Sequence, residues 1–322
     1  HLIGKYHNPP AKVAVMYSGR TDRLCGFPWE GFPGDDFGLP GALWVRMQIE
    51  NRIPFPRDII LDNDFQRGNA DKYRVIIDGG AVIMEEATVG RIEEWVRKGG
   101  IFVSAVPTGR HTPEVKDAWS FARLSGYRIN AGGRGGKLSA VPGQQIFTGD
   151  AWTNAVNAHG APLQQLAADC RTLLVWHDGT PAAGMRKVGN GYVITVPTNV
   201  KGMLDDVLRW SGNYTERLRA PGCFPVQYAS NNGLYRIFVL WADKVKSPTN
   251  TSFVIPGIAA PAVMRNIVTG TLISGVPAQN AMTFNDIAVD RNDIHAYLAP
   301  RGEITCAPLD WFNLQRDWWQ GT

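Results

Sequence analysis

Short apolar runs alternate with amphipathic segments over the first part of the chain, and few folds accept such a pattern. Four apolar runs predict strands, at residues 12–17, 58–61, 73–78 and 101–105. Residues 85–98 predict a helix between the last two, with acids in its first turn, bases in its last and Gly99-Gly100 at its end. Further helices are expected at 40–51 and 112–122. This alternation predicts an α/β fold in which helices cover both faces of a parallel sheet.

The second half of the chain has a different pattern. Residues 172–176, 182–188 and 192–197 predict strands joined at Asp178-Gly179 and Asn190-Gly191, two dipeptides typical of hairpin turns, and a helix at 202–212 follows. Beyond a linker-like stretch at 217–225, the remaining runs predict the short strands of a small all-β sandwich. We therefore expect an α/β domain at 11–214, a β-sandwich domain at 222–302 and a helical tail or connector at 303–322.

The tail is rich in aromatic residues. Trp311, Leu314 and Trp318 fall on one stripe of a helix over 309–320. Because a short helix of this kind persists only when it is docked, we expect the stripe to pack on the body of the chain. Trp319 would then face a neighbouring domain.

Charge and composition exclude several partners. The 33 Lys and Arg residues against 29 Asp and Glu give a net charge of +4, too weak over 322 residues to favour nucleic acid or an anionic membrane. A hydrophobic content of 44% is enough for a buried core, yet no apolar run is long enough to cross a bilayer. The chain opens on His1 without a leader, so we expect a soluble mature form, a tagged product or a piece of a longer protein.

Short motifs of established chemistry are incomplete in this sequence. The Gly-rich stretch at 132–137 lacks the first Gly and the final Ser or Thr of a phosphate loop, so we expect a flexible loop there. Asp62-Asn63-Asp64 lacks the Gly and the Glu of a calcium loop, which leaves a solvated turn. His177 is expected at the surface. The four cysteines, at 25, 170, 223 and 306, form no C-x-x-C pair, and the sequence indicates no cofactor and no metal site.

One long loop carries the groups that hold sugars. Residues 20–38 follow the first strand, and long loops at strand ends are often functional. Trp29, Glu30, Asp35 and Asp36 combine an aromatic ring, which stacks on a sugar, with acids that bond its hydroxyls. We treat these four as candidate sugar-contacting residues. The alternative, a packed loop that meets another domain, stays open.

The order of the motifs resembles a known family. The segments DKYRVIIDGGAVIMEEATVGRIEEWVRKGGIFVSA, TLLVWHDGTPAAGMRKVGNGYVITVPTN and NIVTGTLI follow one another as in the non-catalytic C-terminal half of family 42-type β-galactosidases. The resemblance covers about residues 11–300. It implies a flavodoxin-like fold of the class I glutamine-amidotransferase type, known in that family as a trimerisation domain, followed by a small β-sandwich. It also implies a homo-oligomer, with a trimer as the form that the domain name indicates.

The resemblance transfers no catalytic residue. The family's catalytic glutamates lie on a (β/α)8 barrel, and this chain has no room for one ahead of the matching region. Class I amidotransferases carry a Cys nucleophile on an elbow after the strand that follows "GG". Here the elbow positions hold Ala105 and Val106, followed by Pro107, so covalent glutamine chemistry has no nucleophile.

Three functions remain open at this point. The leading interpretation is a non-catalytic assembly region of a β-galactosidase-like glycoside hydrolase, whose partners are other subunits or domains of the same enzyme and which helps to cover a neighbouring sugar site. The second is a carbohydrate-binding module, with carbohydrate as its partner. The third is a stand-alone hydrolase or amidotransferase-like enzyme with its site in the loop at 20–38.

Overall fold

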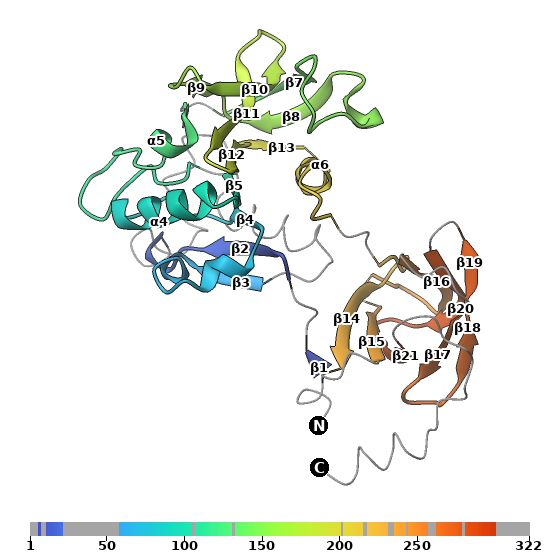
Figure 1. The fold of residues 1–322 in the computed structure, drawn as a ribbon. Helices are drawn as coiled ribbons and strands as arrows, with labels where there is room; N and C mark the ends of the chain where they lie inside the picture. Colours follow the sequence, from blue (N-terminus) through green and yellow to red (C-terminus); the bar gives the residue numbers. More distant parts are fainter. Residues whose placement is uncertain are drawn as a thin grey trace. The chain divides into compact units, whose positions relative to one another are not determined.

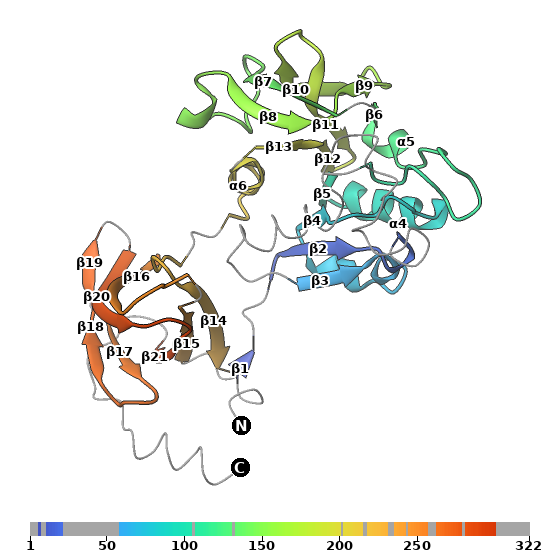
Figure 2. The ribbon, with the colours of Figure 1, turned by 180° about the vertical axis from the view of Figure 1, so that it is seen from behind.

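The structure is a computed structural model, and its ribbon is drawn from two sides in Figures 1 and 2. The chain forms two compact units, an α/β unit within 11–214 and an all-β unit that combines the N-terminal residues with those from Thr215 onward. In the part of the chain that the structure describes, no helix is long and apolar enough to cross a membrane. The described residues are 6–7, 11–21, 58–104, 107–130, 133–200, 202–214, 218–230, 235–242, 244–256, 262–278 and 281–300.

One half of the ten-stranded sheet in the α/β unit is parallel. Its strands lie in the order β3-β2-β4-β5-β12, and all four neighbouring pairs are parallel. The central strand is buried on both faces, with Val75, Ile76 and Ile77 fully enclosed. The expected parallel sheet is confirmed for this half. The bounds are β2 Val13–Tyr17, β3 Asp58–Leu61, β4 Val75–Asp78, β5 Ile101–Ser104 and β12 Gly191–Thr195.

The other half of the sheet is antiparallel, in the order β12-β11-β10-β7-β8-β13. The hairpin between β11 and β12 turns one residue earlier than its sequence indicates, because Val188 pairs with Gly191 and Gly189 takes a φ of 59°. A separate two-stranded ladder joins β6 to β9. The bounds are β6 Tyr127–Ile129, β7 Arg134–Ala140, β8 Val156–Gly160, β9 Leu163–Gln165, β10 Cys170–Trp176, β11 Pro181–Val188 and β13 Thr198–Asn199.

Helices α4 (Glu86–Arg97) and α6 (Met203–Trp210) lie on opposite faces of the sheet, as the ribbon in Figure 1 shows. The apolar stripe of α4 shares one buried cluster with Phe102 and Val193. The Trp210 ring at the end of α6 instead meets Tyr192 edge to face, with ring centroids 5.0 Å apart. Because Tyr192 and Val193 are neighbours on one strand, their side chains point to opposite faces, and so do the helices that they contact.

The prediction of a helix at 112–122 is wrong. Only Ala122–Ser125 is α-helical there, as α5. The Thr112 hydroxyl accepts a hydrogen bond from the backbone N–H of Val115 at 3.0 Å, and His111 Nδ1 accepts one from the backbone N–H of Asp117 at 2.8 Å. The Thr112 bond is one that a helix N-terminus also makes. His111, however, binds the Asp117 N–H that a helix would direct to the carbonyl of Pro113, and Asp117 takes a φ of 55°, outside the helical region.

The loop expected in the Gly-rich stretch is wrong, and the turn expected at Asp62–Asp64 is present but less exposed than predicted. Residues 134–137 belong to β7 and pair with β8, where a side chain at Gly135 would stand 3.0 Å from the His159 ring. Asp62–Asp64 is a 3-10 turn whose first residue is buried, with Asp62 only 9% exposed. Other 3-10 turns span Asn69–Lys72 and Asp150–Trp152. His177 is exposed, as expected.

The all-β unit packs two antiparallel sheets around one core. One sheet has the order β1-β14-β15-β21-β17-β18 and the other β16-β20-β19. Phe238 from the first sheet meets Phe253 from the second, with ring centroids 5.3 Å apart. The bounds are β1 Tyr6–His7, β14 Phe224–Ser230, β15 Tyr235–Trp241, β16 Thr249–Pro256, β17 Val263–Asn266, β18 Leu272–Ser274, β19 Val276–Ala278, β20 Ala281–Val289 and β21 Ile294–Pro300. The helix expected at 40–51 and the tail at 303–322 lie outside the described residues.

Candidate functional site

The carboxyl ends of the parallel strands form the first candidate site, because open α/β sheets bind their ligands at this edge. Polar residues stand at the ends of all five strands: Ser18 follows β2, Asp62 follows β3, and Asp78, Ser104 and Thr195 end β4, β5 and β12. All five are buried, and Asp78 is fully enclosed. Polar groups hidden at such an edge either face a ligand or bond to one another, and their hydrogen bonds decide between these two cases.

Asp78 is bonded entirely within the protein. Its Oδ1 accepts hydrogen bonds from the backbone N–H groups of Gly80 and Ala81, both at 2.8 Å, and its Oδ2 accepts one from the Thr108 hydroxyl at 2.5 Å. The Thr108 and Ser104 hydroxyls lie 2.7 Å apart. Burial raises the pKa of Asp78 above its ordinary value. The carboxylate thus ties the turn after β4 to the segment after β5.

Ser18 and Thr21 make a second inward network at the same edge. The Ser18 hydroxyl donates to Asp62 Oδ2 at 3.0 Å and accepts from the backbone N–H of Thr21 at 3.2 Å. The Thr21 hydroxyl in turn accepts from the backbone N–H of Ile83 at 3.0 Å. The ends of β2 and β3 and the segment after β4 are held together in this way, and their polar groups serve the fold.

Nothing in the described part of this edge supplies a nucleophile of the amidotransferase kind. Residues 105–106, at the expected elbow, lie outside the described residues and are Ala and Val in the sequence. Cys170 begins β10, where its thiol donates to the carbonyls of Ser125 and Gly126 at 3.7 and 3.6 Å and where burial raises its pKa. Within the described ranges, no three His, Cys, Asp or Glu side chains gather as a metal site would require.

The four residues proposed from the sequence as sugar contacts, Trp29, Glu30, Asp35 and Asp36, lie outside the described residues. Their role stays a prediction. Sequence reasoning missed the carboxyl-edge network, although a signal was present. Ser18, Asp78 and Ser104 each interrupt or end an apolar strand run, and a polar residue at that position marks the edge of a parallel sheet.

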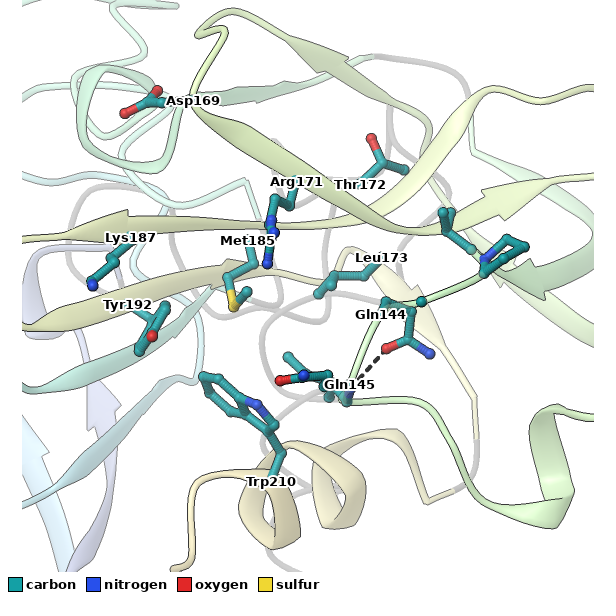
Figure 3. A pocket seen from close by; sticks show the side chains of 14 residues that line it. Gln144, Gln145, Asp169, Arg171, Thr172, Leu173, Met185, Lys187, Tyr192 and Trp210 are labelled. Atoms are coloured by element: carbon teal, nitrogen blue, oxygen red, sulfur yellow. Dashed lines mark hydrogen bonds between the residues drawn. The ribbon is translucent and has the colours of Figure 1, made fainter.

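A second candidate site is a pocket of about 670 Å³ on the antiparallel half of the α/β unit. Figure 3 shows its lining, in which the Trp210 ring stands beside Tyr192 below the strands that carry Arg171, Met185 and Lys187. The loop at 141–146 closes another side. No pattern in the sequence marked this pocket, because its residues come from three strands, a loop and a helix.

This combination of a half-parallel sheet and an antiparallel extension, with an all-β unit after it, occurs in solved glycoside hydrolases. No family model and no curated protein matches the sequence. Gan42B, a GH42 β-galactosidase from G. stearothermophilus, aligns with a TM-score of 0.64 and 14% identity over 91% of this chain and 41% of its own. A β-galactosidase from Bacillus circulans sp. alkalophilus aligns with a TM-score of 0.61 and 18% identity over 86% and 42%. The α-L-fucosidase isoenzyme 2 from Paenibacillus thiaminolyticus gives 0.55 and 14% over 92% and 49%.

The chain therefore has the fold of a part of GH42 β-galactosidases, and the resemblance expected from the sequence is confirmed at the level of the fold. It spans only 41% of the length of the first of them. At 14% to 18% identity, the likeness to these two enzymes concerns the fold alone.

Proposed function

We propose that this chain is the non-catalytic assembly region of a glycoside hydrolase of the β-galactosidase type. The carboxyl edge of the parallel sheet carries this proposal. Asp78 and Ser18 are hydrogen-bonded within the protein there, and the sequence has no Cys at the elbow after β5. The solved enzymes support it further, since this chain matches Gan42B over 91% of its own length but only 41% of that enzyme's.

The parallel half supports a flavodoxin-like fold of the amidotransferase type. Numbered along the chain, its strands lie in the order 2-1-3-4-5, which is the strand order of flavodoxin-like sheets. Helices α4 and α6 on opposite faces agree with this topology. Such a unit without its nucleophile keeps a rigid scaffold, and its surface is then free to serve in contacts between subunits.

We propose other subunits or domains of the same enzyme as the partners. The assembly that we propose is a homo-oligomer, and the family resemblance indicates a trimer. An exposed apolar pair in the all-β unit supports a protein contact. Trp241 and Ile294 oppose each other on β15 and β21 and are 47% and 66% exposed. Adjacent large apolar side chains at a surface are typical of interaction sites. Covering a neighbouring sugar site remains a proposal for Trp29, Glu30, Asp35 and Asp36.

The purified 322-residue chain is expected to hydrolyse neither nitrophenyl glycosides nor glutamine. The reason is the lack of barrel glutamates and of an elbow thiolate. Release of nitrophenol and of ammonia measures the two activities, and a barrel-containing β-galactosidase serves as the positive control. Turnover well above that of a heat-denatured sample would contradict the proposal.

Static light scattering tests the assembly role separately. At micromolar concentration, the chain together with its neighbouring domains is expected to show a mass above that of one protomer. A single-protomer mass across that range would refute the assembly role while leaving the fold assignment intact.

A further inference from the structure

The pocket of Figure 3 is built on one face of three antiparallel strands. Met185 and Lys187 are alternate residues of β11 and therefore share a face. Arg171 opposes Met185 across β10, and Tyr192 opposes Lys187 across β12. Strand register thus places an apolar side chain, two cations and an aromatic ring beside one another.

The apolar part of the pocket has a floor and an aromatic wall. Leu173 and Met185 line the floor and are almost fully buried. The wall is formed by Tyr192 and Trp210, whose planes meet at 78° and hold each other in position. Both rings are half-buried, so each keeps part of its surface for a ligand. The C–H face of a pyranose ring is an apolar surface that packs against such aromatic rings.

The polar part of the pocket carries an excess of positive charge. Arg171 and Lys187 are both exposed, and among the described residues neither makes a side-chain hydrogen bond or ion pair with another. The pocket's acid, Asp169, is engaged by Arg186 at 3.0 Å. Two cations therefore stand at the pocket without an acidic partner, and an anionic group on a ligand would supply one.

The loop wall is fixed before any ligand arrives. The Gln144 side chain closes the loop on itself, since its Oε1 accepts from the backbone N–H groups of Ile146 and Phe147 at 2.7 and 2.8 Å. Its Nε2 donates to the Phe147 carbonyl at 2.6 Å. The neighbouring Gln145 is exposed and lines the pocket, where its amide can bond sugar hydroxyls. A wall that is already ordered lowers the entropy cost of binding.

We infer that this pocket binds an acidic saccharide, a sugar chain that carries a carboxylate or a sulfate. The aromatic wall packs against the faces of the sugar rings, and Gln145 forms hydrogen bonds with hydroxyl groups. Arg171 and Lys187 bind the anionic group. The volume of about 670 Å³ falls in the range of small-molecule sites. This site goes beyond the assembly role and does not depend on it.

Calorimetric titration of the full chain tests the inference. The probes are trigalacturonate, a sulfated galactotriose and neutral galactotriose, with AMP as a phosphate-bearing aromatic ligand. We expect at least one acidic trisaccharide to bind at least tenfold more tightly than both neutral galactotriose and AMP. The double variant Arg171→Glu/Lys187→Glu should weaken that binding at least tenfold. Lys137→Glu, a charge reversal of another exposed lysine on the same sheet but outside the pocket, should leave it unchanged.

Several results would overturn the inference. These are equal affinity for neutral and acidic trisaccharides, tighter binding of AMP, or an equal loss of binding in Lys137→Glu. Circular dichroism checks that each variant is folded, and Trp210→Phe, which keeps an aromatic wall, should retain most of the affinity. Light scattering separates this test from the assembly role. A change of mass in the double variant would place these residues in a subunit contact and would also overturn the inference.

Discussion

Asp78→Ala is expected to lower the free energy of unfolding of the α/β unit by about 3–5 kcal/mol, because a buried donor left without its acceptor costs about 1–3 kcal/mol and this change affects three donors. The carboxylate is fully enclosed and accepts hydrogen bonds from Gly80, Ala81 and Thr108. Alanine would leave these donors buried without an acceptor. Urea unfolding followed by circular dichroism measures the loss, and a change below about 1 kcal/mol would show that the network contributes little.

Asp78→Asn is the matched control for shape. The amide oxygen keeps an acceptor for the two backbone N–H groups, and the Thr108 hydroxyl can rotate to accept from the amide nitrogen. We expect this variant to lose clearly less stability than Asp78→Ala. An equal loss in both variants would mean that the negative charge, and not the hydrogen bonding, holds the turn after β4.

The difference in stability between the wild type and Asp78→Asn should depend on pH, with a sign that the pKa shift of Asp78 defines. Burial raises the pKa of Asp78 in the folded state above its ordinary value of 3.8. A raised folded pKa means that the folded state binds this proton more tightly than the unfolded state does. Its stabilising contribution is therefore complete below the unfolded pKa and is lost as the pH rises through the folded pKa. The stability of the wild type relative to Asp78→Asn should fall over that interval.

Gly191→Ala is expected to be the other severe substitution, with a loss of about 3 kcal/mol or more, as for overpacking of a well-packed core. A Cβ at the start of β12 would overlap the backbone carbonyls of Val96 and Gly100. Backbone atoms cannot rotate away as a side chain does, so the C-terminal end of α4 would have to shift. Thermal melting measures the effect, and an unchanged melting temperature would show that this junction yields easily.

Gly90→Ala is the control from the same part of the fold. Gly90 lies within α4, and a Cβ there would meet nothing within 4 Å. Alanine is favoured over glycine in a helix by about 0.5–1 kcal/mol, so this variant should melt slightly above the wild type. The same substitution is thus expected to act in opposite directions at two glycines of one unit.

Local pattern was sufficient to predict the parallel strands and α4. The runs at 12–17, 73–78 and 101–105 are apolar because both faces of these strands are buried, and the run at 58–61 forms the edge strand, with Ile59 and Leu61 exposed. The apolar stripe of α4 repeats from one helical turn to the next, and its charges lie in the first and last turns, so both can be read from neighbouring residues. Each signal reaches only a few residues along the chain.

Contacts, most of them between distant residues, decided what the sequence pattern could not. Residues 112–122 have a helical pattern, but the His111 ring accepts a hydrogen bond from the Asp117 backbone N–H, and the segment forms turns. The Gly-rich residues 134–137 read as a loop, but their pairing with β8 makes them a strand. The carboxyl-edge network joins Ser18 to Asp62 and Asp78 to Thr108, and the pocket joins Gln145, Arg171 and Trp210. A contact between distant residues depends on how whole strands and helices pack, and no periodicity within one segment records that packing.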